Sequence, residues 1–151
     1  MFKRIVLILI CLFFTVNAGF SKDIPLTIRP VSKITTSNLK LQNGDSVEFL
    51  IAEDVKIDSK MEFKKGQKVY GTITSREENG FMNEVSNIYI ENFYTKDRGG
   101  KRIKLKGIVY KEGRSHDMIN GFLPLICILI RGGEVQINSE KNTFTIYWEE
   151  N

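Results

Sequence analysis

Cysteine and histidine, the residues most often used for cross-links, zinc binding and nucleophilic catalysis, are scarce in this chain. Its 151 residues include two cysteines and one histidine. Cys11 lies in the apolar N-terminal run, so Cys127 has no intramolecular disulfide partner once that run is removed. One Cys and one His do not make an ordinary zinc site. We therefore expect packing to hold the fold, with no metal and no cofactor, and Cys127 to be a small buried apolar residue.

A strong excess of one charge is also missing. The formal net charge is +4, and Lys3 and Arg4 in the N-terminal run contribute to it. Such a small excess does not indicate a nucleic-acid-binding protein. We expect no nucleic acid among the partners.

An obvious catalytic constellation is absent as well. Ser115, His116 and Asp117 are consecutive, whereas a catalytic base must lie beside its nucleophile in space and be oriented by a third group. Adjacent side chains in a loop point in divergent directions. We therefore expect that the protein is not an enzyme, and an unrecognised hydrolase is the least favoured alternative.

The N-terminus predicts a helical, cleavable signal peptide. A short positive end, Lys3 and Arg4, precedes the apolar run Ile5–Val16. Small residues follow, and we expect cleavage between Ala18 and Gly19. The run is shorter than the roughly 20 residues of a membrane-spanning helix. The expected protein is exported, most simply to the periplasm, and an uncleaved membrane-anchored form is the alternative.

The rest of the chain has the pattern of short strands. β-branched and aromatic runs are separated by clusters of Gly, Asn and Lys, such as Lys64–Gly66 and Arg98–Gly100, without a strong helical period. We expect an all-β single domain, a β-barrel or sandwich of about seven or eight short strands. Residues 1–18 are the expected signal peptide, 19–42 an extended N-terminal segment and 43–151 the domain. Alternation places the following residues on shared faces: Val47, Phe49 and Ile51; Val69, Gly71 and Ile73; Ile88 and Ile90; Phe144, Ile146 and Trp148.

Several segments carry more specific expectations. Ile24–Pro30 is strand-like but holds two prolines, which predicts an edge strand or a strap. Lys111–Gly121 is polar and irregular, as in a loop. Phe122–Ile130 is apolar apart from one proline, which fits a strand buried on both faces. Glu134–Asn138 and Thr143–Trp148 are predicted to pair as a hairpin.

A basic strand face is the best candidate binding site. Alternation along Arg102–Tyr110 aims Arg102, Lys104 and Lys106 out of one face, and Tyr110 continues the same parity. A basic face beside an aromatic ring can hold an anionic polymer or a lipid head group. The alternative is an ordinary strand face that its charges keep soluble.

Turn glycines and alternation between residues 43 and 107 resemble a recurring pattern of small uncharacterised exported bacterial proteins. The matching residues are Gly44–Val47, Asp54-Val55, Lys65-Gly66, Val69–Ile73, Gly80, Ile88–Ile90, Gly99-Gly100 and Ile103–Gly107. More distantly, this string is similar to the β-barrel domain of TrbI/VirB10-like scaffolds of conjugation and type IV secretion. The resemblance implies a non-enzymatic barrel that assembles in the periplasm.

Two functions remain open at this point. The leading expectation is a non-catalytic scaffold or accessory module of the cell envelope, which binds an envelope protein or self-associates. The alternative is a module that binds an anionic envelope polymer or lipid head group through Arg102, Lys104, Lys106 and Tyr110. Strong dependence of binding on salt would favour the alternative.

Overall fold

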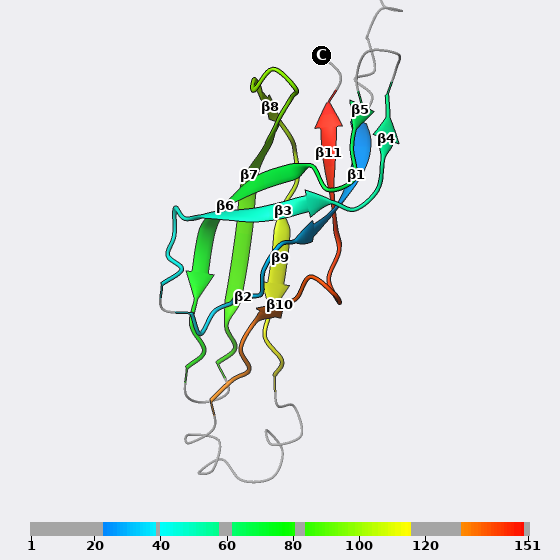
Figure 1. The fold of residues 1–151 in the computed structure, drawn as a ribbon. Coiled ribbons are helices and arrows are strands. Elements are labelled where there is room, and N and C mark those ends of the chain that lie inside the picture. Colours follow the sequence, from blue (N-terminus) through cyan, green and yellow to red (C-terminus); the bar gives the residue numbers. More distant parts are fainter. Residues whose placement is uncertain (1–22, 39, 58–61, 81–83, 116–130, 150–151) are drawn as a thin grey trace, which may run out of the picture.

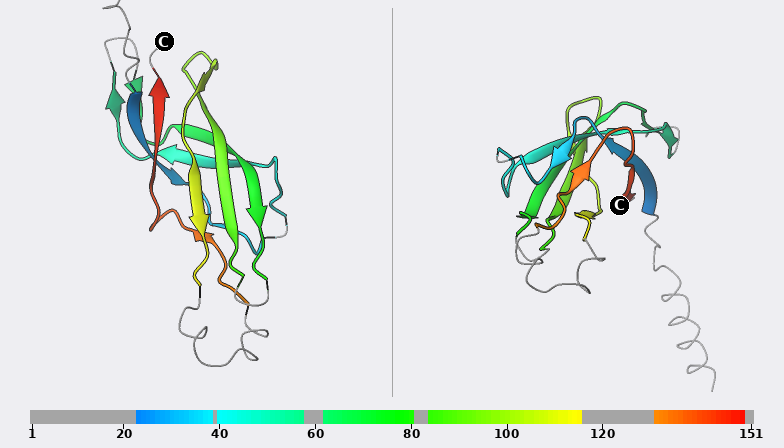
Figure 2. Two further views of the ribbon diagram at one scale, coloured as in Figure 1. Left: turned by 180° about the vertical axis from the view of Figure 1, so that it is seen from behind. Right: turned by 90° about the horizontal axis from the view of Figure 1, so that it is seen from below.

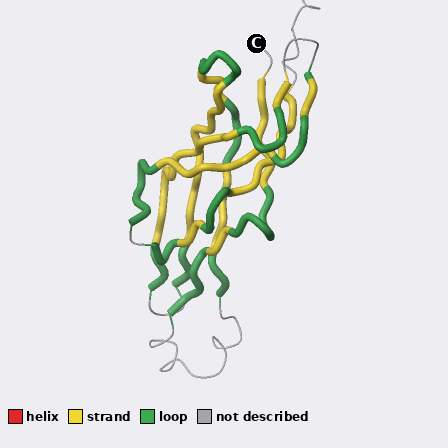
Figure 3. The backbone as a smooth tube through the Cα atoms, in the orientation of Figure 1, coloured by secondary structure: helices red, strands yellow, loops and turns green. Residues whose placement is uncertain are grey.

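The structure, a computed structural model, describes residues 23–38, 40–57, 62–80, 84–115 and 131–149. This part of the chain is all-β, and only strands and loops are drawn in Figure 3. Its strands are β1 (Asp23–Pro30), β2 (Ile34–Thr35), β3 (Ser46–Ile51), β4 (Val55–Lys56), β5 (Glu62–Phe63), β6 (Lys68–Glu77), β7 (Asn87–Lys96), β8 (Arg102–Lys104), β9 (Val109–Glu112), β10 (Gln136–Ile137) and β11 (Phe144–Glu149).

The main sheet is antiparallel and curls into a half-barrel. Its strand order is β11-β1-β3-β6-β7-β8, and β9 pairs with β7 further along that strand. Figure 1 shows β3 and the first part of β6 crossing in front of the long strands as the sheet bends, and the left view of Figure 2 shows the same crossing from behind. An isolated antiparallel bridge between Lys106 and Tyr147 joins the segment after β8 to β11, at the other end of the order. The fold prediction is confirmed in its all-β class, and within the described residues the sheet is a half-barrel.

Alternation along the strands builds the core, as the sequence predicted. Val47, Phe49 and Ile51 of β3 are buried, and so are Val69 and Ile73 of β6. Phe49 lies at the centre, where its ring meets the rings of Phe93 and Phe144 edge-on at centroid distances of 5.7 and 6.4 Å. Edge-to-face aromatic pairs of this kind add to the stability that burial supplies.

β1 is an interior strand, so the prediction of an edge strand or strap was wrong. Asp23–Ile28 pairs with β11, and Ile28–Pro30 pairs with β3. The Thr27 carbonyl accepts a hydrogen bond from the Ala52 N–H on the β3 side, so Pro25, two residues earlier, also directs its nitrogen away from β11. Pro30 has the opposite parity and lies beyond the last residue paired with β11. Each proline therefore occupies a position where no ladder hydrogen bond needs its missing N–H.

The predicted continuous strand Arg102–Tyr110 is broken into β8 and β9. β7 pairs with β8 up to Tyr94 and resumes with β9 at Ile90. Between these points, Asn92 has a φ of 54° and Gly107 has a φ of 153°. The positive φ angles bend β7 at Asn92 and the β8–β9 segment at Gly107, and this interrupts the ladder of hydrogen bonds. Lys111 and Glu112 continue β9, so the predicted loop begins later than expected.

The predicted C-terminal hairpin was also wrong. β10 pairs with β2 and β11 pairs with β1. A turn separates them, in which the Asn142 N–H donates to the Asn138 carbonyl at 3.0 Å. This turn sends the two strands to different sheets.

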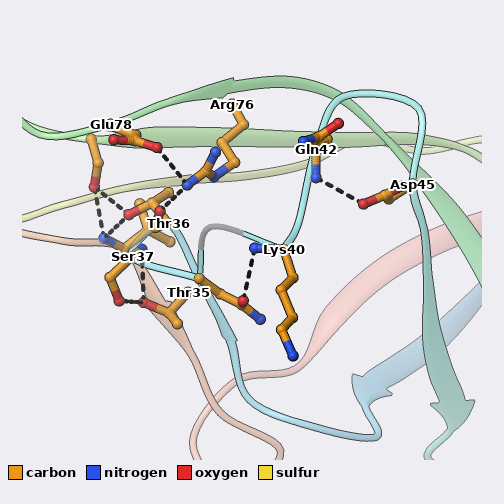
Figure 4. A network of polar contacts seen from close by, with 11 residues as sticks. Thr35, Thr36, Ser37, Lys40, Gln42, Asp45, Arg76 and Glu78 are labelled. Atoms are coloured by element: carbon orange, nitrogen blue, oxygen red, sulfur yellow. Dashed lines mark hydrogen bonds and ion pairs between the residues drawn. The ribbon is translucent and has the colours of Figure 1, made fainter.

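Polar contacts tie β2 and β10 to the end of β6 and β7 that lies away from β8 (Figure 1). The buried Thr36 hydroxyl donates to the Ser86 hydroxyl at 2.9 Å, and both oxygens accept from the Val135 N–H. The Arg76 guanidinium reaches the Thr36 carbonyl and Glu78 (Figure 4). These contacts satisfy the buried Thr36 and Ser86 hydroxyls, whereas the Arg76 Nε is buried without a hydrogen-bond partner in the described structure.

Some predictions fall outside the described residues: the signal peptide 1–18 with its Ala18–Gly19 cleavage site, the His116-Asp117 pair, and the strand Phe122–Ile130 with Cys127. In the described ranges, no helix is long and apolar enough to cross a membrane.

Candidate ligand-binding face

The outer side of β8 and β9 carries the residues that the sequence selected. Arg102, Lys104, Lys106 and Tyr110 are all exposed, whereas the intervening Leu105 is buried. The parity argument for this face therefore holds, although the strand is broken between β8 and β9. A side chain on the outer face of a sheet is free to meet a ligand without rearrangement of the core.

Register brings further cations and aromatic rings beside Arg102 and Lys104. Arg102 lies opposite Lys96 on β7, and Lys104 lies opposite Tyr94. Tyr94 in turn lies opposite Tyr70 on β6. Val69 pairs with Thr95, which puts Lys68 next to Lys96. Two rows result on the outer face: Lys68, Lys96 and Arg102 in one, and Tyr70, Tyr94 and Lys104 in the other. We call these six residues the basic face.

Tyr94 is the centre of the basic face. Its ring stacks on Tyr70 with centroids 5.2 Å apart and an interplanar angle of 24°. The Arg102 Cζ lies over the same ring, 4.6 Å from its centroid. Because Tyr70 and Arg102 come from the strands on either side of β7, they flank Tyr94 from opposite sides. This contact fixes the guanidinium and leaves the N–H groups in its plane able to donate to an anion.

The cations of this region differ in whether a carboxylate already neutralises them. Lys68 forms an ion pair with Glu48 at 2.9 Å, and Lys106 forms one with Glu149 at 2.5 Å. The hydrogen bond to the carboxylate is the main cause that raises the pKa of each lysine. In the part of the chain that the structure describes, Lys96, Arg102 and Lys104 have no ion pair. Their charge is therefore available to a ligand.

Tyr110 lies apart from the basic face. It pairs with Tyr89 on β7, and the two rings are 4.6 Å apart. Its hydroxyl donates to Glu112 at 3.0 Å, and this hydrogen bond is the main cause that raises the pKa of Tyr110. The distorted stretch of β7 at Asn92 separates the Tyr89–Tyr110 pair from Tyr94 and Lys104. The structure therefore divides the predicted site into two parts.

Four residues of the basic face were not in the predicted site: Lys68, Tyr70, Tyr94 and Lys96. Lys68 and Tyr70 occupy outward positions of β6, on the opposite parity to the buried Val69. Alternation showed that they face outward, but only the register between β6 and β7 shows which residues of β7 they meet.

The chemistry of the described residues fits binding through charge and aromatic contact. Across the described ranges, no group of three or more His, Cys, Asp or Glu residues is placed to hold a metal ion. No family model, curated protein or solved structure matches the chain. The resemblance to the secretion scaffold barrel stays a prediction, and the basic face has to be interpreted from its own geometry.

Proposed function

We propose that the protein is a non-catalytic, exported envelope component that binds an anionic ligand on the basic face. The ligand's chemistry is a phosphate or similar oxyanion, supplied by an envelope polymer or by a lipid head group. One observation carries the proposal: Lys96, Arg102 and Lys104 lack carboxylate partners in the described structure, and Arg102 is held over Tyr94. An anion supplies the counter-charge that these three side chains lack.

The test is binding of fluorescent polyphosphate, a soluble polyanion, to the purified full chain. Lys104→Glu removes one favourable charge and adds a repulsive one. We expect it to weaken binding by about thirtyfold, since each of the two units of charge changed contributes ~1 kcal/mol near an anionic surface. Raising the salt concentration from about 0.01 to about 1 M should weaken wild-type binding steeply, because it shortens the screening length from ~30 to ~3 Å.

Lys141→Glu is the matched control. Lys141 is an exposed lysine in the turn between β10 and β11, so its reversal changes the net charge by the same amount. The proposal requires that Lys141→Glu keep nearly wild-type affinity. An equal loss of polyphosphate affinity in the two variants would show that binding depends on net charge alone, and would contradict the assignment of the basic face as the binding site.

A scaffold that binds a protein partner is the second candidate, and the strand edges favour it. In the described sheet, β9 pairs only with β7, and β11 meets the β8–β9 segment at the Lys106–Tyr147 bridge alone. Free backbone groups at such edges can accept a strand from another protein or from a second copy. Crosslinking in cells, followed by identification of the captured envelope proteins, tests it: stoichiometric capture of one partner through β9 supports this function. If β9 and β11 were instead paired in a closed barrel, as the resemblance to the secretion scaffolds implies, neither edge could accept a strand from a partner.

A further inference from the structure

Exposed apolar side chains gather at one place on the described surface. The large ones are Val31, Tyr89, Ile108, Tyr110 and Tyr147. Tyr89 and Tyr110 are paired on β7 and β9, Ile108 comes just before β9, and Tyr147 lies on β11 opposite Lys106. Ile108 is the most exposed of them, at 62%. Monomeric proteins seldom concentrate exposed apolar groups in this way unless the patch contacts something.

The backbone connects this group to the basic face. Lys106 exchanges two hydrogen bonds of 2.7 Å with Tyr147, which brings the outer side of β11 beside the β8–β9 segment. Ile108 and Tyr110 follow Lys106 with the same parity, and Tyr89 pairs with Tyr110. We call Tyr89, Ile108, Tyr110 and Tyr147 the apolar seam. Residues 104–110 therefore join the seam to Lys104 across the bend at Gly107.

We propose that the basic face and the apolar seam dock together on an anionic lipid surface. The inference rests on the proposed function and names the source of its anion. Lys96, Arg102 and Lys104 contact lipid phosphates, while Ile108 and the tyrosine rings enter the boundary between head groups and acyl chains. Tyrosine favours that boundary because its ring is apolar and its hydroxyl remains hydrated.

Two features favour a lipid surface over a soluble polymer. A soluble anionic polymer would bind to the cations alone, so its binding would not explain the exposed Ile108. A sugar polymer would need open aromatic faces, whereas the Tyr94 ring is flanked by Tyr70 and Arg102. A lipid surface uses the apolar and the cationic groups at once.

Charge argues against a second copy of the chain on the same surface. A symmetric contact would bring Arg102 and Lys104 of one copy close to those of the other, and no carboxylate in the described structure neutralises these charges. Like charges brought together in an interface oppose association. An anionic lipid surface contacts both the basic face and the apolar seam without this repulsion between like charges.

The experiment compares vesicle flotation with polyphosphate binding for the same variants, each purified after export and processing by the cell. The vesicles contain equal parts of phosphatidylglycerol and phosphatidylcholine, or phosphatidylcholine alone. Ile108→Ser should weaken binding to the anionic vesicles by about 3- to 10-fold and leave polyphosphate binding unchanged, because it removes only apolar contact. Lys104→Glu should weaken both. Val31→Ser is the matched control, since Val31 is an exposed apolar residue on the β1 side, and it should behave as the wild type.

The outcomes separate the inference from the proposed function. If Ile108→Ser binds anionic vesicles as the wild type does, while Lys104→Glu loses both ligands, the lipid inference is overturned and the anion-binding function stands. Equal binding to neutral and anionic vesicles, or an Ile108-dependent dimer in sedimentation, also overturns the inference. If Lys104→Glu changes neither ligand, the proposed function itself fails. Unchanged urea midpoints for all variants show that the fold is intact.

Discussion

At the scale of single residues, Gly71 shows how closely the inner face is filled. It lies on β6 between the buried Val69 and Ile73, where the pattern allows any small or apolar residue. A Cβ at this position would lie 2.5 Å from Phe93 Cε1 and 2.7 Å from Ile90 Cγ2. The absence of a side chain therefore allows the Phe93 ring to pack beneath β6, against Phe49.

Gly71→Ala should destabilise the protein by about 1–3 kcal/mol, because the added methyl group overpacks the core. Urea unfolding measures the change. Gly99→Ala is the control: Gly99 is exposed, lacks a positive φ, and its added Cβ would have Asp97 Oδ1 as its nearest neighbour at 3.4 Å. We expect that variant to stay within ~0.5 kcal/mol of the wild type. A neutral Gly71→Ala would mean that Phe93 can move aside.

The sequence predicted the face of Gly71 correctly and could not predict its neighbours. Parity is a property of one strand, so Val69, Gly71 and Ile73 could be placed together without knowledge of the fold. The contact with Phe93 depends on the register between β6 and β7. That register shifts between Tyr70 and Thr72, a local irregularity that no pattern in either strand indicates.

At the scale of elements, the irregularity in β7 centres on Asn92. The alternation of Arg102–Tyr110 is uninterrupted in sequence, so it predicted one strand where the structure has β8 and β9. The cause lies partly in the neighbouring strand, where Asn92 adopts a φ of 54°. Asn tolerates this conformation better than other residues with a side chain, apart from a few small polar ones.

Asn92→Val should therefore destabilise the protein by about 1–2 kcal/mol, since a β-branched residue strongly disfavours a left-handed backbone. Asn92→Gly keeps the conformation at little cost and serves as the matched variant, expected within about 0.5 kcal/mol of the wild type. Thermal and urea unfolding compare the two. Equal losses for Val and Gly would show that the Asn92 side chain matters through its contacts and not through its backbone.

Strand pairing explains the other errors at this scale. The hairpin prediction for the last two strands assumed that neighbours in sequence pair, which is the common case but not a rule. The actual partners, β2 for β10 and β1 for β11, are about 100 and about 120 residues away in sequence. The prolines of β1 misled for a related reason. Pro25 and Pro30 each avoid the ladder because β11 and β3 cover different halves of β1.

At the scale of the whole molecule, curvature assembles the candidate site. The sequence placed Arg102 and Lys104 on one outward face, but the rows of the basic face take residues from β6, β7 and β8. The same curvature carries β11 round to the β8–β9 segment. Gly107 permits this approach, because a Cβ there would lie 2.7 Å from Ile146 Cγ2. Neither relation is present in any single segment of sequence.

The ion pair between Lys106 and Glu149 also holds β11 beside the β8–β9 segment, and the pKa of Lys106 provides a test of its contribution. The hydrogen bond to Glu149 raises the pKa of Lys106 above its ordinary value in the folded protein. The stabilisation is then fully present below the ordinary lysine pKa and is lost as pH rises through the higher folded value. Lys106→Met should lower the urea midpoint by a constant amount between about pH 7 and pH 10, and the difference should shrink above that range. Lys104→Met, which removes an unpaired lysine on the same face, should lower the midpoint at no pH. An equal fall in both variants would show that the lysine stems, and not the ion pair, hold β11 in place.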